Sequence, residues 1–322
     1  MHKTFIKLKK IISIILFNII AIVTLWFISD VCLYITSLKL NNQLSFQNLK
    51  KFYKKPNNPY YVNDFFCIDN NSEYRSRKPV GLQYKSPPIL LFGCSYAYGS
   101  YLGDNQNFGH KLSNQIQVPV FNRAIPGCSL QHMYYQTTTL EFYKSVLKCD
   151  TVVYVIISDH FRRMLGEVFN IYENSFYMHY KYKNRIFIMD NYKDFFAIFY
   201  KYNYTLRAIR KIYYYFYLKN PKNYDKITDE ALAYFIKTRE NLENHWHNKI
   251  NFVVLFYGSC MYENILMNKL KENKFIIIST NDLTKEDIYS RKYKFSDNHP
   301  NEAAWDLLTP LFVQKMKQEK VF

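Results

Sequence analysis

Residues 88–99 read PILLFGCSYAYG. The stretch begins with an apolar run that ends at Gly93, and Ser95 comes two residues after that glycine. A short run of this kind, without polar alternation, is typical of a strand buried on both faces. Ser95 therefore follows the carboxyl end of a strand, which is the edge of an open α/β sheet where ligands bind. This segment predicts both the type of sheet and the place of its functional residues.

Four further apolar runs have the same character, and stretches of helical character lie between them. The predicted strands are 118–122, 151–157, 251–257 and 275–278. The predicted helices are 105–115, 130–147, 229–246, 263–271 and 302–317. Buried strands that alternate with helices form right-handed βαβ units, which predicts an α/β domain with a parallel sheet covered on both faces.

The stretch of about 165–225 interrupts this alternation and is predicted to be an insertion. Within it, 176–182 and 185–189 flank Lys183 and Asn184, which indicates a hairpin. Residues 195–218 have helical character and are rich in tyrosine and phenylalanine. The insertion is a candidate lid or membrane-facing flap; alternatively, its aromatic residues form only its own core.

The N-terminus carries a candidate membrane anchor. Residues 11–29 contain no charged side chain and follow four lysines, and as a helix they would be about 28 Å long, enough to cross a bilayer core. We expect an uncleaved signal anchor that stands apart from the domain, with a cleaved signal peptide as the alternative. The positive-inside rule then leaves the N-terminus cytoplasmic and the domain on the periplasmic or extracellular side.

The expected organisation has three parts. Residues 1–40 form the anchor, with the transmembrane span at about 11–29. Residues 41–86 are polar and turn-rich, and form a tether and lead-in. Residues 87–322 form the α/β domain that carries the insertion.

The composition excludes several classes of protein. Hydrophobic residues make up 48% of the 322 residues and aromatic residues 19%, which is incompatible with a disordered chain. The formal net charge of +17 would suit nucleic acid, but the translocation signal places the domain away from it. We therefore expect the excess positive charge to form a basic surface that lies near anionic lipid or glycan. The six cysteines include no CxxC pair, so neither a zinc site nor a disulfide framework is expected.

Three further segments place polar residues where the carboxyl edge of the sheet should be. Asn122 and Gly127 follow the second strand, and a glycine there lets the backbone approach closely and donate its N–H. Ser158, Asp159, His160, Arg162 and Arg163 follow the third strand. Asp297 and His299 precede the last helix, and an imidazole beside a carboxylate can act as an oriented general base.

In this order, the four segments resemble the SGNH (GDSL-type) hydrolase superfamily over roughly residues 86–318. Gly93-Cys94-Ser95 is similar to the Gly-Asp-Ser block, 122–127 to the second block, and 156–159 to the third. Asp297 and His299 are similar to the block that holds the acid and the base. The sequence departs from the family at Cys94, where the family has aspartate, and at Ser158, where it has asparagine.

The resemblance implies a three-layer α/β/α, flavodoxin-like fold with a serine hydrolase site that needs no cofactor and no metal. Ser95 would be the nucleophile, His299 the base and Asp297 the acid that orients it. The oxyanion hole would come from Ser95, Gly127 and Ser158, the last with a shorter donor than asparagine.

The expected substrate is an ester on an envelope or extracellular glycan, such as an O-acetyl group. Asn122, Asp159, His160 and Arg162 are candidates for substrate binding, because they follow strands at the same edge. For Asp159 and the arginines, structural ion pairs are the alternative. Two other functions remain open: an O-acyltransferase with the same triad, and a non-catalytic glycan-binding envelope protein.

Overall fold

The computed structural model describes residues 2–40, 87–164, 180–183, 186–189, 204–259 and 262–321. These fall into two compact units. The N-terminal unit holds α1 (His2–Leu40) and residues 204–216 of α10 (Tyr204–Lys219). The sheet unit holds the central sheet with its helices and the β4–β5 pair. The predicted tether at 41–86 lies outside the described residues.

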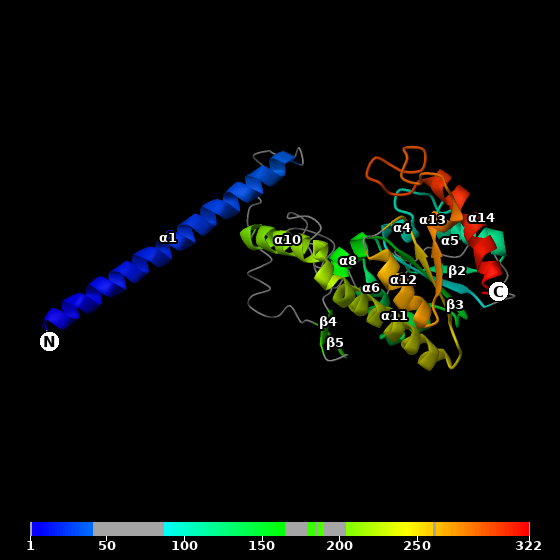
Figure 1. The fold of residues 1–322 in the computed structure, drawn as a ribbon, viewed down its shortest axis with the longest axis horizontal. Coiled ribbons are helices and arrows are strands. Elements are labelled where there is room, and N and C mark those ends of the chain that lie inside the picture. Colours follow the sequence, from blue (N-terminus) through cyan, green and yellow to red (C-terminus); the bar gives the residue numbers. More distant parts are fainter. Residues whose placement is uncertain are drawn as a thin grey trace. The chain divides into compact units, whose positions relative to one another are not determined.

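The predicted parallel sheet is confirmed (Figure 1). Its strands are β1 (Ile89–Phe92), β2 (Val120–Asn122), β3 (Thr151–Ile156), β6 (Asn251–Phe256) and β7 (Ile276–Ser279). They lie in the order β2-β1-β3-β6-β7, and every neighbouring pair is parallel. This is the flavodoxin-like order, in which the chain winds outward in both directions from the point between β1 and β3.

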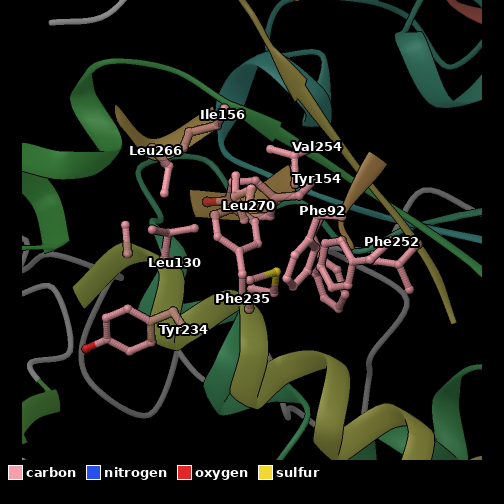
Figure 2. Packing of buried hydrophobic residues seen from close by; sticks show 14 of the residues in the cluster. Phe92, Leu130, Tyr154, Ile156, Tyr234, Phe235, Phe252, Val254, Leu266 and Leu270 are labelled. Carbon is pink, nitrogen blue, oxygen red and sulfur yellow. The ribbon is translucent and has the colours of Figure 1, made fainter. Parts of the chain in front are cut away.

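Alternate residues of each strand belong to two separate cores. Leu90, Phe92, Val152 and Tyr154 point into one core, which α6, α7, α11 and α12 cover. Figure 2 shows the centre of this core, where aromatic residues from the sheet meet Phe235 of α11. The intervening strand residues point into a second core, which α5 and α14 cover. The period of two in the strands therefore gives the expected three-layer α/β/α sandwich.

The helices of the sheet unit agree with the predicted ranges, with one exception. They are α5 (Phe108–Ile116), α6 (Leu130–Gln136), α7 (Leu140–Ser145), α11 (Tyr224–Trp246), α12 (Glu263–Glu272) and α14 (Glu302–Gln318). The single helix predicted over 130–147 is wrong, because the chain breaks between α6 and α7. At the break, Thr137 and Thr138 donate to backbone carbonyls, and Thr139 caps α7 by accepting from Phe142 N. Threonine side chains of this kind compete with the backbone bonds of a helix.

Among the described residues, four short helical elements were not predicted. Two of them, α4 (Ser95–Tyr98) and α8 (Asp159–Met164), follow strands β1 and β3 at the functional edge. The other two are α13 (Thr280–Leu283) and the 3-10 turn η2 (Pro221–Asn223). Elements of a single turn are too short to show a periodic pattern in the sequence.

The hairpin expected in the insertion is present. Strands β4 (Tyr180–Lys183) and β5 (Ile186–Met189) pair antiparallel. The helix expected at 195–218 is observed as α10, which begins at Tyr204. Residues 165–179 and 190–203 lie outside the described residues.

Helix α1 is continuous, as expected for an anchor. Its stretch Ile15–Leu33, with a mean hydropathy of 2.2, is long and apolar enough to cross a membrane, and a signal sequence would have the same property. The helix does not stand entirely apart, because Asp30 accepts a hydrogen bond from the backbone N–H of Thr205 (2.7 Å). Thr205 Oγ1 also lies 3.2 Å from Ser29 Oγ. No pattern in the sequence predicts this contact with α10.

Candidate active site

Gly93 makes the sharp turn that carries Ser95 out of β1. Its φ of +150° is unfavourable for a side chain, and a Cβ there would lie 2.7 Å from Ala97 Cβ and 3.1 Å from Val155 O. Ser95 is the first residue of α4 and is 7% exposed. The glycine is therefore required both by the backbone conformation and by the close approach of β3.

Ser95, His299 and Asp297 lie together. The Oγ of Ser95 is 2.7 Å from Nε2 of His299, although the two residues are 204 positions apart. On the other side of the ring, Nδ1 lies 2.9 Å from Oδ2 of Asp297, but its N–H is not well aligned with that oxygen. Loose alignment of such bonds is common in sites without substrate. The three side chains have the arrangement of a nucleophile, a base and an orienting carboxylate.

The loop that carries Asp297 and His299 is tightly folded. Asp297 Oδ1 accepts from the backbone N–H of His299 (3.2 Å), and Phe295 N donates to His299 O (2.8 Å). Tyr96, one residue after the nucleophile, donates to Asn298 O (2.9 Å). Asn298 adopts a left-handed backbone with φ of 70°, which asparagine tolerates better than most residues. The loop is thus tied directly to the turn that holds Ser95.

Asp297 remains charged well into the acid range. Partial burial raises the pKa of its carboxyl, but the backbone N–H of His299, the His299 charge and the neighbouring side chains of Tyr101 and His299 lower it by more. The net effect is a pKa below the usual value for aspartate. A carboxylate that stays ionised can keep the imidazole oriented over a wide pH range.

Two tyrosines that the sequence did not single out frame the His299 ring. The Tyr96 ring lies 5.2 Å from it at 50°, and the Tyr101 ring lies 5.4 Å away at 80°. Tyr101 has a left-handed φ of 68° and is 71% exposed. The PILLFGCSYAYG segment contains Tyr96 and Tyr98, and Tyr101 follows it closely, but nothing in the spacing distinguishes the tyrosines that contact the histidine.

The expected oxyanion donors lie at the same edge of the sheet. Beyond β2 the chain continues to pair with β1, since Arg123 N donates to Leu91 O (2.7 Å) and Ile125 N to Gly93 O (3.1 Å). Gly127, with φ of 77°, comes two residues later. The backbone N–H groups of Ser95 and Gly127 have no acceptor within the part of the chain that the structure describes. They are therefore available to a substrate oxygen.

Ser158, the third expected donor, follows β3 directly. β3 ends at Ile156 and lies next to β1 in the sheet, so Ser158 is at the same edge of the sheet as Ser95. Ser158 is exposed. Its role as an oxyanion donor stays a prediction.

Asn122 is not placed to bind substrate, contrary to expectation. It is 1% exposed, and both ends of its amide are used within the fold. Nδ2 donates to Ala97 O (2.9 Å), and Oδ1 accepts from Ala124 N (3.1 Å). The amide thus fastens the end of β2 to helix α4 and supports the turn after Ser95.

His160 is also not a substrate-binding residue in this structure. It is fully buried, and Nδ1 lies 3.1 Å from the hydroxyl of Tyr154. Its Nε2 has no hydrogen-bond partner among the described residues. Burial, together with the positive charges of Arg163 and His132, holds its pKa well below the usual value. The ring turns into the core because its tyrosine partner lies on the inward face of β3.

Asp159 and Arg162 form an ion pair at the surface, with Arg162 Nη1 3.2 Å from Asp159 Oδ1. Arg163 Nη2 lies 3.6 Å from the other oxygen, and its Nη1 donates to Cys128 O (3.2 Å). The arginine at 163 is nearly buried. These contacts agree with the structural alternative, in which the charges hold α8 in place.

None of the described cysteines forms a disulfide. Cys94, Cys128 and Cys149 are buried, and Cys32 is exposed. Cys94 is the N-cap residue of α4, but its side chain makes no capping bond. Its sulfur lies 3.9 Å from Ser95 Oγ, so the family's aspartate position here holds a small apolar group. Cys67 and Cys260 lie outside the described residues. Among the residues described, no group of three or more His, Cys, Asp or Glu could hold a metal ion.

The sequence matches no protein-family model and no curated protein. Among solved structures, it is similar to a lipase from a goat rumen metagenome, with 10% identity and a TM-score of 0.44 over 71% of this chain and 97% of that one. A lipolytic protein of the G-D-S-L family from Veillonella parvula aligns with 11% identity and a TM-score of 0.42, over 71% and 97%. A carbohydrate esterase family 2 enzyme with a carbohydrate-binding domain, from Corynascus thermopiles, aligns with 11% identity and a TM-score of 0.39, over 74% and 68%. Lipolytic and GDSL-like proteins recur among these similar structures.

Proposed function

We propose that this protein is a serine ester hydrolase of the SGNH (GDSL) type. The observation that carries the proposal is the 2.7 Å contact between Ser95 Oγ and His299 Nε2, with Asp297 2.9 Å from the other ring nitrogen. A serine, a histidine and a carboxylate in this relation form an activated nucleophile. The site lies at the carboxyl edge of the sheet, beside the switch point between β1 and β3.

The reaction follows from these positions. Nε2 of His299 takes the hydroxyl proton as Ser95 Oγ bonds to the ester carbonyl carbon. The oxyanion that forms accepts from the backbone N–H groups of Ser95 and Gly127, with Ser158 as a third donor. Nε2–H then protonates the departing alkoxide, which leaves an acyl-serine. A water molecule, deprotonated by the same nitrogen, releases the acid and restores Ser95.

We propose further that α1 anchors the protein in a membrane and leaves the sheet unit on the periplasmic or extracellular side. The four lysines that precede the uncharged run support this orientation. Esters that are accessible there include acyl groups on envelope or extracellular glycans. The proposed substrate class is therefore an O-acylated glycan, with acetyl as the simplest acyl group.

Labelling with a fluorophosphonate probe tests the proposal, because the probe phosphonylates only an activated serine. The full chain should be labelled in membranes, and Ser95→Ala and His299→Ala should lose the label. Ser296→Ala is the matched control, since this serine is exposed in the loop that holds Asp297. It should label like the unmodified protein.

Mass spectrometry of the labelled peptide should place the adduct on Ser95. A folded protein that does not react, as judged by an unchanged thermal transition, would contradict the proposal. That result would favour the non-catalytic glycan-binding alternative. Product analysis with an acetylated glycan, with and without a second glycan as acceptor, then separates hydrolysis from acyl transfer.

A further inference from the structure

Helix α10 exposes an apolar stripe in the N-terminal unit. Ile209 is 52% exposed, Ile212 58%, Tyr213 58% and Phe216 66%. Their spacing of three, four and seven residues places them on one face of the helix. Scattered exposed apolar residues are common, but a continuous stripe of large ones over two turns indicates a contact surface.

The first turn of α10 is fixed to the end of the candidate membrane span. Asp30 is fully buried and accepts from Thr205 N (2.7 Å), while Ser29 Oγ lies 3.2 Å from Thr205 Oγ1. Asp30 is the first charged residue after the uncharged run of α1. Asp30 also lies in the last turn of the Ile15–Leu33 stretch, so it is close to the boundary between the apolar core and the headgroups when α1 spans a bilayer. Helix α10 therefore begins at the level of the membrane surface.

The composition of α10 fits that place. Its sequence carries Arg207, Arg210, Lys211 and Lys219 and no acidic residue. Five of its last seven residues are aromatic: Tyr213, Tyr214, Tyr215, Phe216 and Tyr217. Tyrosine is enriched at the level of the headgroups, and basic residues are attracted to anionic lipids. Helices that lie in the interface combine an apolar face with this kind of charge.

We infer that α10 is an interfacial helix, whose stripe Ile209, Ile212, Tyr213 and Phe216 inserts into the surface of an anionic bilayer next to α1. The stripe contacts lipid rather than a second copy of the chain, because the first turn of α10 is hydrogen-bonded to the end of the membrane span. The helix would be about 24 Å long, so it lengthens the contact with the membrane beyond a single span. The inference rests on the proposed anchoring by α1.

Photo-crosslinking in membranes of phosphatidylglycerol and phosphatidylethanolamine tests this inference on the full chain. Benzoylphenylalanine is introduced at 212 or 216, and adducts with alkyne-tagged lipid are counted. The control position is Leu140 of α7, which is 66% exposed, the same fraction as Phe216. Phe17 of α1, 71% exposed, reports the anchor itself. We expect lipid adducts at 17, 212 and 216 and none above background at 140.

Each other outcome identifies which statement fails. Adducts at 17 without adducts at 212 and 216 would leave the anchor intact and overturn the interfacial helix. A crosslinked dimer at 216 would show that a second copy covers the stripe, and an adduct within one chain would show that the chain covers it. Absence of lipid adducts at all three positions would overturn the anchor and the inference together. Labelling of Ser95 by the fluorophosphonate is independent of all these results.

Discussion

The ring of Tyr101 stands edge-on to the imidazole of His299, with their centroids 5.4 Å apart at 80°. Its hydroxyl also interacts with the side chain of Asp297, and this interaction together with the aspartate charge raises the pKa of the phenol. One tyrosine thus contacts both the base and the carboxylate that orients it. A non-glycine residue held at φ of 68° carries strain, which is frequent at functional sites.

Replacing Tyr101 with phenylalanine keeps the ring and removes the hydroxyl that interacts with Asp297. We expect kcat/KM for a model ester to fall about threefold to tenfold, because a solvent-exposed polar interaction of this kind contributes on the order of 1 kcal/mol. The thermal transition should not change, since the side chain is largely exposed. The acid limb of the pH–rate profile should move to higher pH, because the hydroxyl lowers the pKa of Asp297. Identical kinetics and an identical acid limb would show that the hydroxyl has no part in positioning the carboxylate.

Replacing Gly93 with alanine should destabilise the sheet unit by about 2–3 kcal/mol, as expected for a strained backbone with a close contact. Both causes are present, since φ is +150° and the new Cβ would lie 2.7 Å from Ala97 Cβ. Gly103→Ala is the matched control. At Gly103 the nearest atoms are the ends of the Gln106 and Asn105 side chains, at 3.2 and 3.3 Å, and these can move. Urea unfolding of the two variants should differ clearly, and equal midpoints would refute this account of the turn.

His132 should make the folded protein less stable in acid. Burial, then the charge of Arg163, lowers its pKa to about 3, against a smaller opposing effect of the Ser129 N–H. The unfolded chain binds a proton near pH 6.5 but the folded chain does not, so stability falls as the pH drops from about 6.5 toward 3, by about 1.4 kcal/mol per pH unit. His132→Asn, which retains an acceptor, should lose less stability than the unmodified protein between pH 6 and 4.

Glu230 provides a control of opposite sign. Burial raises its pKa to about 7, with Lys226 opposing, so its protonated form stabilises the folded state at low pH and this contribution is lost as the pH rises through 7. Glu230→Gln should therefore gain stability over the unmodified protein at pH 8 and converge with it near pH 4. Parallel pH–stability curves for all three proteins would contradict both pKa shifts.

The Asp159 charge should matter for stability much more than the Arg162 charge. Asp159→Asn removes a carboxylate that lies 3.6 Å from the nearly buried Arg163. We expect this change to lower the free energy of unfolding by about 1–3 kcal/mol. Arg162→Ala removes only the partly exposed partner of Asp159, and we expect it to lower the free energy of unfolding by about 0–1 kcal/mol. Activity per folded molecule should be unchanged in both variants. A drop in kcat/KM without a change in the free energy of unfolding would restore these residues to the substrate site.

The sheet could be predicted because its strands are buried on both faces and therefore read as unbroken apolar runs. The contact between Ser95 and His299 could be predicted because parallel strands bring the loops after them to one edge. The break between α6 and α7 could not, since it depends on which backbone carbonyls the three threonines bind. The same limit applies to Asn122 and His160. Position after a strand places a residue at the functional edge, but only the packed structure shows that their side chains turn inward.

The geometry of the candidate site also depends on a helix that lies far from Ser95 in the sequence. His299 is followed by α14, whose Trp305 stacks on Phe108 of α5 with ring centroids 4.6 Å apart. Asn301 caps this helix by accepting from Ala304 N. During synthesis, Ser95 emerges from the ribosome 204 residues before His299, and the loop that carries His299 is held in place only after α14 docks on α5. A nascent chain therefore carries the proposed nucleophile before its proposed base, and the contact between the two forms only once α14 has been made.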